Sequence, residues 1–157
     1  MLRRASLILF SVLLATFAIS QAPSKLQFQK MYDKLSKAFE NKNETEFLSY
    51  MTPQFEQVQN GKPPVTRAQI ANMFQREMAT FKSVHWYRQV LKLTPNGPAI
   101  DVYVSSHLVA TIVEKNQPHD YVIDSKSLDT WNSSMKIEQS RVMKLSIIKD
   151  GKHITLR

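Results

Sequence analysis

The 157-residue chain has no cysteine and only three glycines, and each scarcity excludes classes of protein. Without cysteine there is no disulfide scaffold, no thiolate metal site, no cysteine nucleophile and no thiol for a lipid anchor. The glycines stand alone at Gly61, Gly97 and Gly151, which excludes a glycine-rich phosphate-binding loop. The length and the 43% share of hydrophobic residues predict one domain with its own hydrophobic core.

The chain also lacks a concentrated basic segment, although it carries 21 basic and 13 acidic residues. Nucleic-acid binders usually gather Lys and Arg on one stripe with aromatic residues between them, so we expect no nucleic-acid partner. The GxSxG motif of serine hydrolases is absent. The histidines lack the short spacing of a dedicated metal site, so we expect no metal and no cofactor; they are His85, His107, His119 and His153.

The first twenty residues, Met1–Ser20, have the form of a secretory signal peptide. Arg3 and Arg4 precede an apolar run over Ala5–Ile19, which is shorter than the roughly 20 residues that span a bilayer. We expect cleavage before Gln21; the alternatives are a cut two residues later and an uncleaved anchor. Removing two of the 21 basic residues leaves 19 against 13 acidic ones, a net charge of +6. The prediction is an exported domain, periplasmic or extracellular, over 21–157, which meets a membrane only during export.

The first half of the chain carries a helical period. Apolar residues in 26–41 recur every three or four positions and share one helix face. Asn43 has the form of a cap for a short second helix, which Thr52-Pro53 would end. Thr66 and Gln69 form a capping box for a third helix. The expected elements are helices over 26–41, after Asn43 and over 67–81, with a brief strand over 55–59.

After Phe81 the period changes to two, which indicates strands. The even positions of 100–112 are apolar, so we expect them to face the core. Asp101 and His107 share the opposite face and do not form a dyad. Turn residues separate the strands. We expect strands over 84–94, 100–112, 121–131 and 135–148, with a last short hairpin at Asp150-Gly151, and therefore an α+β fold.

Three segments in this order resemble the nuclear transport factor 2-like superfamily, in its SnoaL-like and ketosteroid-isomerase-like bacterial branch. They are AFENKNETEFLSYMTPQF (Ala38–Phe55), the stretch from Gly61 through VTRAQIANMFQ, and DTWNSSMKIEQSRVMK (Asp129–Lys144). The resemblance covers about residues 26–149. It implies a cystatin-like fold, in which three N-terminal helices wrap a cone-shaped, curved antiparallel sheet around a pocket. Members include isomerases, cyclases, dehydratases and domains without known chemistry, so function has to be argued from the site.

Candidate pocket residues follow from strand parity. Tyr32 matches the region of a helix-one tyrosine in that family. The alternative is that Tyr32 is an aromatic residue of the hydrophobic core. In 84–94 the odd and even sets compete, and Leu91 with Leu93 favours the odd set, which includes His85 as a candidate base. Ser106 is the one polar residue among the inner positions of 100–112. The expected pocket lining is Tyr32, His85, Tyr87, Gln89, Ser106, Gln139 and Arg141.

The strand expected over 135–148 carries Arg141, which is the only arginine or lysine in the expected pocket lining. Without a bulge, Gln139 and Arg141 project into the pocket, and a buried Arg requires an anionic partner, which suggests an acidic ligand. With a bulge, Arg141 turns to solvent. The aspartates are expected near turns or on outward positions, where no apolar surroundings would raise a pKa; they are Asp101, Asp120, Asp124 and Asp129.

These observations support two functional hypotheses. The leading one is a non-catalytic exported module that binds a small apolar or weakly acidic molecule, with homodimerisation through outer residues Tyr103, His107 and Val109. The alternative is an isomerase, cyclase or dehydratase with an acid–base pair in the pocket, using His85 or an aspartate as base and Tyr32 or Tyr87 as donor.

Overall fold

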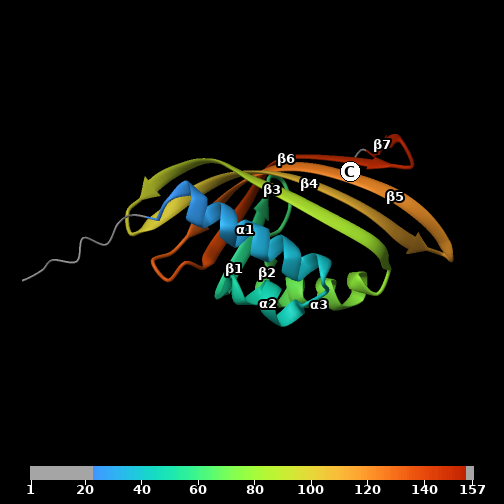
Figure 1. Cartoon of the computed structure of the whole chain (residues 1–157), viewed down its shortest axis with the longest axis horizontal. Helices are drawn as coiled ribbons and strands as arrows, with labels where there is room; N and C mark the ends of the chain where they lie inside the picture. The colour runs from blue at the N-terminus through green and yellow to red at the C-terminus, as the bar shows by residue number, and fades with distance from the viewer. Residues whose placement is uncertain (1–22, 155–157) are drawn as a thin grey trace, which may run out of the picture.

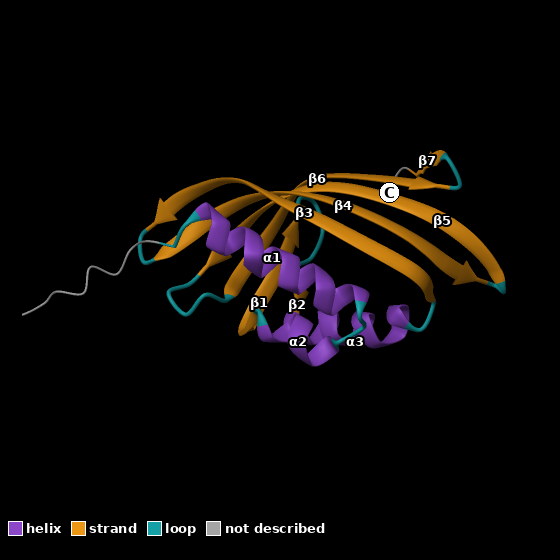
Figure 2. Ribbon diagram, viewed as in Figure 1, coloured by secondary structure: helices purple, strands orange, loops and turns teal. Residues whose placement is uncertain are grey.

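The computed structural model describes residues 23–154, so the predicted signal peptide and its cleavage site lie outside the described residues. Three helices and seven strands follow one another along this part of the chain (Figures 1 and 2). The helices are α1 (Lys25–Glu40), α2 (Glu44–Ser49) and α3 (Arg67–Met78). The strands are β1 (Met51–Gln59), β2 (Val65–Thr66), β3 (Phe81–Asn96), β4 (Ala99–Glu114), β5 (Gln117–Trp131), β6 (Ile137–Lys149) and β7 (Lys152–Ile154).

The caps expected from the sequence are present. The Asn43 side chain accepts a hydrogen bond from the Glu46 backbone N–H at the start of α2. Thr66 and Gln69 form a reciprocal capping box at the start of α3, as do Ser24 and Gln27 at the start of α1. The third helix ends three residues earlier than expected, because Phe81 already belongs to β3.

All strands belong to one curved sheet in the order β2-β1-β6-β5-β4-β3, with β7 paired to β6. The expected α+β fold is confirmed, with one difference: the sheet is mixed, because β1 runs parallel to β6. A parallel neighbour requires a long connection, and α3 with the three long hairpin strands supplies it. The sheet is not closed, and the helices lie against its concave side (Figure 2).

The core forms where α1 crosses the sheet. Trp131, at the end of β5, is fully buried. Its ring packs edge-on against Phe28 and Tyr32 of α1, with both centroid distances at 5.5 Å. Helix α1 is therefore seated on the end of β5 by three large aromatic side chains.

Helix α1 also covers the free edge of the sheet at β3. The Gln29 side chain donates to the Arg88 carbonyl at 2.7 Å and accepts from the Val90 N–H at 2.9 Å. The Glu40 carboxylate accepts a hydrogen bond from the backbone N–H of Trp86 at 2.7 Å. Unpaired backbone groups on an edge strand would otherwise invite pairing with another chain. Side chains of α1 thus replace a missing neighbouring strand and hold β3 in place.

Two strands change parity within their length because of β-bulges. In β3, Val90 pairs with Val104 and Lys92 with Tyr103, so Leu91 is the extra residue. In β6, register shifts leave Glu138 and Met143 as extra residues. Each extra residue moves the following side chains to the other face of the sheet.

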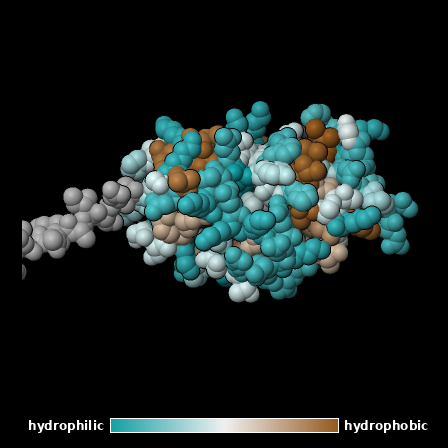
Figure 3. Space-filling view, viewed as in Figure 1, coloured by the Kyte–Doolittle hydropathy of each residue, from teal (hydrophilic) through white to brown (hydrophobic). Residues whose placement is uncertain are grey.

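The face of the molecule in Figure 3 is mostly hydrophilic, with apolar patches towards the two ends of the long strands. None of the helices described between residues 23 and 154 combines the length and the apolar character needed to cross a membrane.

Candidate functional site

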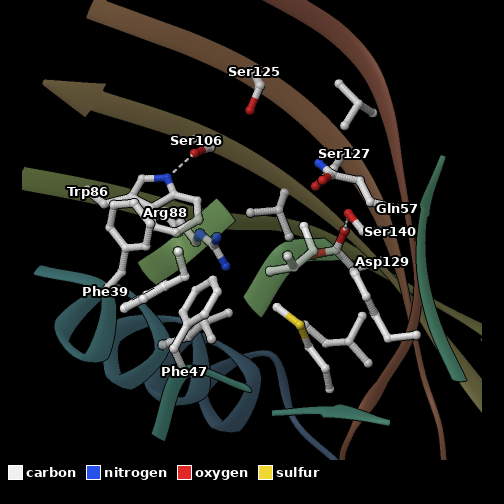
Figure 4. Close-up of a pocket in the computed structure, with 18 of the residues that line it drawn as sticks. Phe39, Phe47, Gln57, Trp86, Arg88, Ser106, Ser125, Ser127, Asp129 and Ser140 are labelled. Carbon is white, nitrogen blue, oxygen red and sulfur yellow. Dashed lines mark hydrogen bonds between the residues drawn. The ribbon is translucent and has the colours of Figure 1, made fainter. Parts of the chain in front are cut away.

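A cavity of about 220 Å³ lies between the helices and the concave face of the sheet. Its volume exceeds the roughly 150 Å³ of an engineered apolar cavity that binds benzene. The helix side is apolar except for the exposed Glu77, and its apolar residues are Leu35, Phe39, Phe47, Ile70, Met73, Phe74 and Met78. The strand side carries polar groups, namely Gln57, Arg88, Ser106, Ser125, Ser127, Asp129 and Ser140 (Figure 4). The cavity thus suits a small molecule with an apolar body and a polar edge.

The polar end of the cavity is organised by the buried carboxyl group of Asp129, which is 4% exposed. The Tyr32 hydroxyl donates to its Oδ2 at 2.7 Å, and the Ser140 hydroxyl donates to its Oδ1 at 2.6 Å. Trp131 Nε1 donates to the Tyr32 oxygen at 2.9 Å. Because an indole N–H can only donate, the Tyr32 proton is directed at Asp129, whose two oxygens both act as acceptors.

This relay, formed by Trp131, Tyr32, Asp129 and Ser140, affects the ionisation of the phenol. Burial raises the pKa of Tyr32 well above its usual value, and the negative charge of Asp129 raises it further. Tyr32 therefore remains a neutral hydrogen-bond donor at physiological pH. It anchors the carboxylate to α1 and does not itself line the cavity.

Arg88 lies on β3 beside the aromatic wall of the cavity (Figure 4). The side chain of Arg88 is half-buried, and part of it is accessible from the cavity. Its Cζ stacks 3.3 Å from the centroid of the Trp86 ring. Burial lowers the pKa of Arg88 to about 10, and the Asp129 charge opposes part of this shift, so the guanidinium stays positive at neutral pH. The Trp86 indole N–H in turn donates to the Ser106 hydroxyl.

The prediction for β3 was wrong in its parity. His85, Tyr87 and Gln89 are exposed, and the inner face carries Trp86 and Arg88. The bulge explains the error. Leu93 does pack against the core, as expected, but the extra residue Leu91 means that positions before it follow the opposite parity.

The expectation for β6 is corrected in the same way. Arg141 is exposed and Gln139 does not line the cavity, because the bulge at Glu138 turns Ser140 and Val142 inward. The guanidinium of the cavity comes from β3.

The expectation that every aspartate lies near a turn or faces outward was wrong for Asp129. Its position two residues before the buried Trp131 was the available signal, because residues i and i+2 of a strand share a face. Ser106 lies in the lining, as the parity of β4 predicts, and Tyr32 lies in the adjacent core.

Two histidines form pairs with aspartates away from the cavity. His107 contacts Asp124 at 2.7 Å on the outer face, and His119 contacts Asp150 at 2.7 Å near the last hairpin. Within residues 23–154 there is no group of three acidic or histidine side chains suited to a metal ion.

Comparison of the sequence with known proteins gives no relatives: no family model matches the chain, and no curated protein matches it. Comparison of the structure gives many. A scytalone dehydratase-like protein from Novosphingobium aromaticivorans has a TM-score of 0.67 and 10% identity, over 82% of this chain and 87% of its own. A SnoaL-like polyketide cyclase-type protein from Shewanella denitrificans has a TM-score of 0.53 and 11% identity, over 73% and 87%. The epoxide hydrolase/cyclase-like enzyme SalBIII, of pyran ring formation in salinomycin, has a TM-score of 0.61 and 17% identity, over 74% and 90%.

At such low identity these similarities show the fold alone. They confirm that the chain has the nuclear transport factor 2-like fold, which the three sequence segments resembled.

The relay predicts a specific effect of Tyr32→Phe. This change leaves a buried carboxylate oxygen and the Trp131 N–H without their partner, so the free energy of unfolding should fall by about 1–3 kcal/mol. A raised folded-state pKa contributes stability below the unfolded pKa of about 10, and that contribution is lost as pH rises above 10. The deficit of the variant should therefore shrink above pH 10 in denaturant titrations.

Tyr87→Phe is the matched control, because Tyr87 is 63% exposed on the outer face. Tyr87→Phe should change the free energy of unfolding by no more than about 0.5 kcal/mol. A Tyr32→Phe protein as stable as the parent at neutral pH would contradict the relay.

Proposed function

We propose that this protein, with its nuclear transport factor 2-like fold, is a non-catalytic module that binds a small molecule in the cavity between the helices and the sheet. The observation that carries the proposal is the division of the cavity into an aromatic, apolar side and a hydroxyl-rich side (Figure 4). Binding sites typically combine a predominantly apolar lining with a few placed polar groups.

The hydrogen bonds that hold Asp129 in place support binding over catalysis. Both of its oxygens already accept hydrogen bonds from the protein, from Tyr32 and from Ser140. His85, the histidine considered as a general base, lies on the exposed face of β3. Asp129 thus serves first to order the polar end of the cavity.

Occupation of the cavity can be tested with the neutral fluorescent probe N-phenyl-1-naphthylamine. Ser127→Phe places a ring in the cavity and should weaken probe binding at least about tenfold, as loss of roughly 1.4 kcal/mol implies. Lys126→Phe is the matched control, since the neighbouring position faces outward and is exposed. Equal affinities of both variants and the parent, or no binding to the parent, would contradict the proposal.

A second candidate is an acid–base enzyme of the isomerase, cyclase or dehydratase kind. It is favoured by one observation: a carboxylate, Asp129, does line the cavity. In D₂O, such an enzyme should exchange acidic C–H protons of a bound keto compound from a small panel, with loss of exchange in Asp129→Asn. Exchange that is detected by NMR and abolished in this variant would favour the enzyme over the binding module. No exchange across a panel that binds would reject it.

We also propose export and homodimerisation. Export rests on the pattern of Met1–Ser20, and dimerisation on the outer face of the sheet, where Tyr87 and Val109 are exposed beside His107. Native mass spectrometry of the protein from its own host should give the mass of two chains that begin at Gln21. A single-chain mass would reject the dimer, and the mass of the uncut chain would reject cleavage. A Val109→Glu variant should give the single-chain mass, because the substitution would bury an unpaired charge in the interface.

A further inference from the structure

The polar side of the cavity holds two opposite charges that do not contact each other. Arg88 is the only basic residue in the lining within the described part of the chain. Asp129 influences its ionisation, yet no ion pair within 4.0 Å joins them. The carboxylate is already bonded to Tyr32 and Ser140. The protein therefore satisfies the hydrogen-bonding groups of Asp129 and leaves those of Arg88 open.

The guanidinium uses its flat face and leaves its edge unused. The face lies on the Trp86 ring, which is itself oriented by Ser106. Between residues 23 and 154, no side-chain hydrogen bond involves the five N–H donors of Arg88, whereas its backbone carbonyl is fixed by Gln29. A planar set of donors held in place by stacking matches the two oxygens of a carboxylate.

The surroundings of Arg88 restrict what else such a ligand can carry. Phe39 and Phe47 lie beside the Trp86 ring on which Arg88 stacks, with centroid distances of 4.7 Å and 6.3 Å. Phe74 packs on Phe47 and extends this apolar wall of the cavity, which suits an aromatic or aliphatic body. Asp129 and the more exposed Glu77 are the acidic residues of the lining. One anionic group can pair with Arg88, but a second would lie near these negative charges.

We infer that the ligand of this cavity is a small apolar monocarboxylic acid whose carboxylate is bound by the edge of the Arg88 guanidinium. This inference rests on the proposed binding function and specifies its ligand class. Arg88 acts as the specificity-determining residue, and Asp129 disfavours acids with two charges.

The test compares probes of nearly equal shape and different charge by isothermal titration calorimetry. 2-Naphthoic acid, 2-naphthamide and 2,6-naphthalenedicarboxylic acid are titrated into the purified protein at neutral pH. The monoacid should bind at least about tenfold more tightly than the amide, as a charge-assisted bidentate pair implies. The diacid should bind more weakly than the monoacid. Equal affinities for the monoacid and the amide would overturn the inference.

Variants connect this preference to one side chain. Arg88→Gln should reduce the ratio of the monoacid and amide affinities to near one. Arg88→Lys should keep part of the preference, because an ammonium retains the charge without the planar pair of donors. Arg141→Gln is the matched control, since Arg141 is exposed on β6 outside the cavity, and it should preserve the full ratio.

The outcomes separate the inference from the function on which it rests. Binding of neutral N-phenyl-1-naphthylamine without any preference for the monoacid would overturn only the ligand class. Absence of binding by all probes would overturn both. If circular dichroism shows that Arg88→Gln does not fold, two other measurements test the inference. They are the ratio of monoacid to amide affinity in Arg88→Lys and the same ratio in the parent protein. A preference that survives intact in every folded Arg88 variant would remove Arg88 from the site.

Discussion

The structure depends on satisfying one buried carboxylate. Asp129 lies in the core, where an unpaired charge would cost several kcal/mol, so its hydrogen-bond partners stabilise the folded chain. Tyr32 supplies a donor from α1, and Ser140 supplies one from β6. Trp131 orients the Tyr32 hydroxyl and packs on α1 from the end of β5. One group therefore links the first helix to the two strands that close the polar end of the cavity.

This arrangement explains why the cavity has a polar side without an ion pair. Each oxygen of Asp129 accepts a hydrogen bond from a neutral hydroxyl, and no ion pair within 4.0 Å joins it to Arg88. Arg88 is placed by other contacts: α1 fixes its backbone through Gln29, and Trp86 supports its guanidinium. The helix that covers the sheet edge thus also positions the cationic group. The position of α1 on the sheet therefore has three consequences. It forms the core around Trp131, it covers the free edge at β3, and it fixes the backbone of Arg88.

Local patterns were sufficient for most of the fold. The capping box at Thr66 and the cap at Asn43 marked helix starts, because each depends only on residues within one turn. The even positions of β4 faced the core as predicted, since that strand runs from Ala99 to Glu114 with an unbroken register to β5. The aspartate of the site shares parity with Trp131 and could have been found by extending the same argument along β5. The cavity itself could not, because it depends on how far the helices stand from the sheet.

The spacing of apolar residues along the chain predicts a helix or a strand, and it predicts which face of that element is buried. It does not predict a bulge, and one extra residue at Leu91 or Glu138 exchanges the faces of a strand. For this reason Arg88 entered the cavity, while Arg141 and His85 turned to solvent. The contact between Tyr32 and Asp129 joins positions 97 residues apart, beyond the reach of any local pattern. Helices, strands and turns were thus set by neighbours along the chain, whereas the site arose from distant side chains that had to be hydrogen-bonded once they were buried.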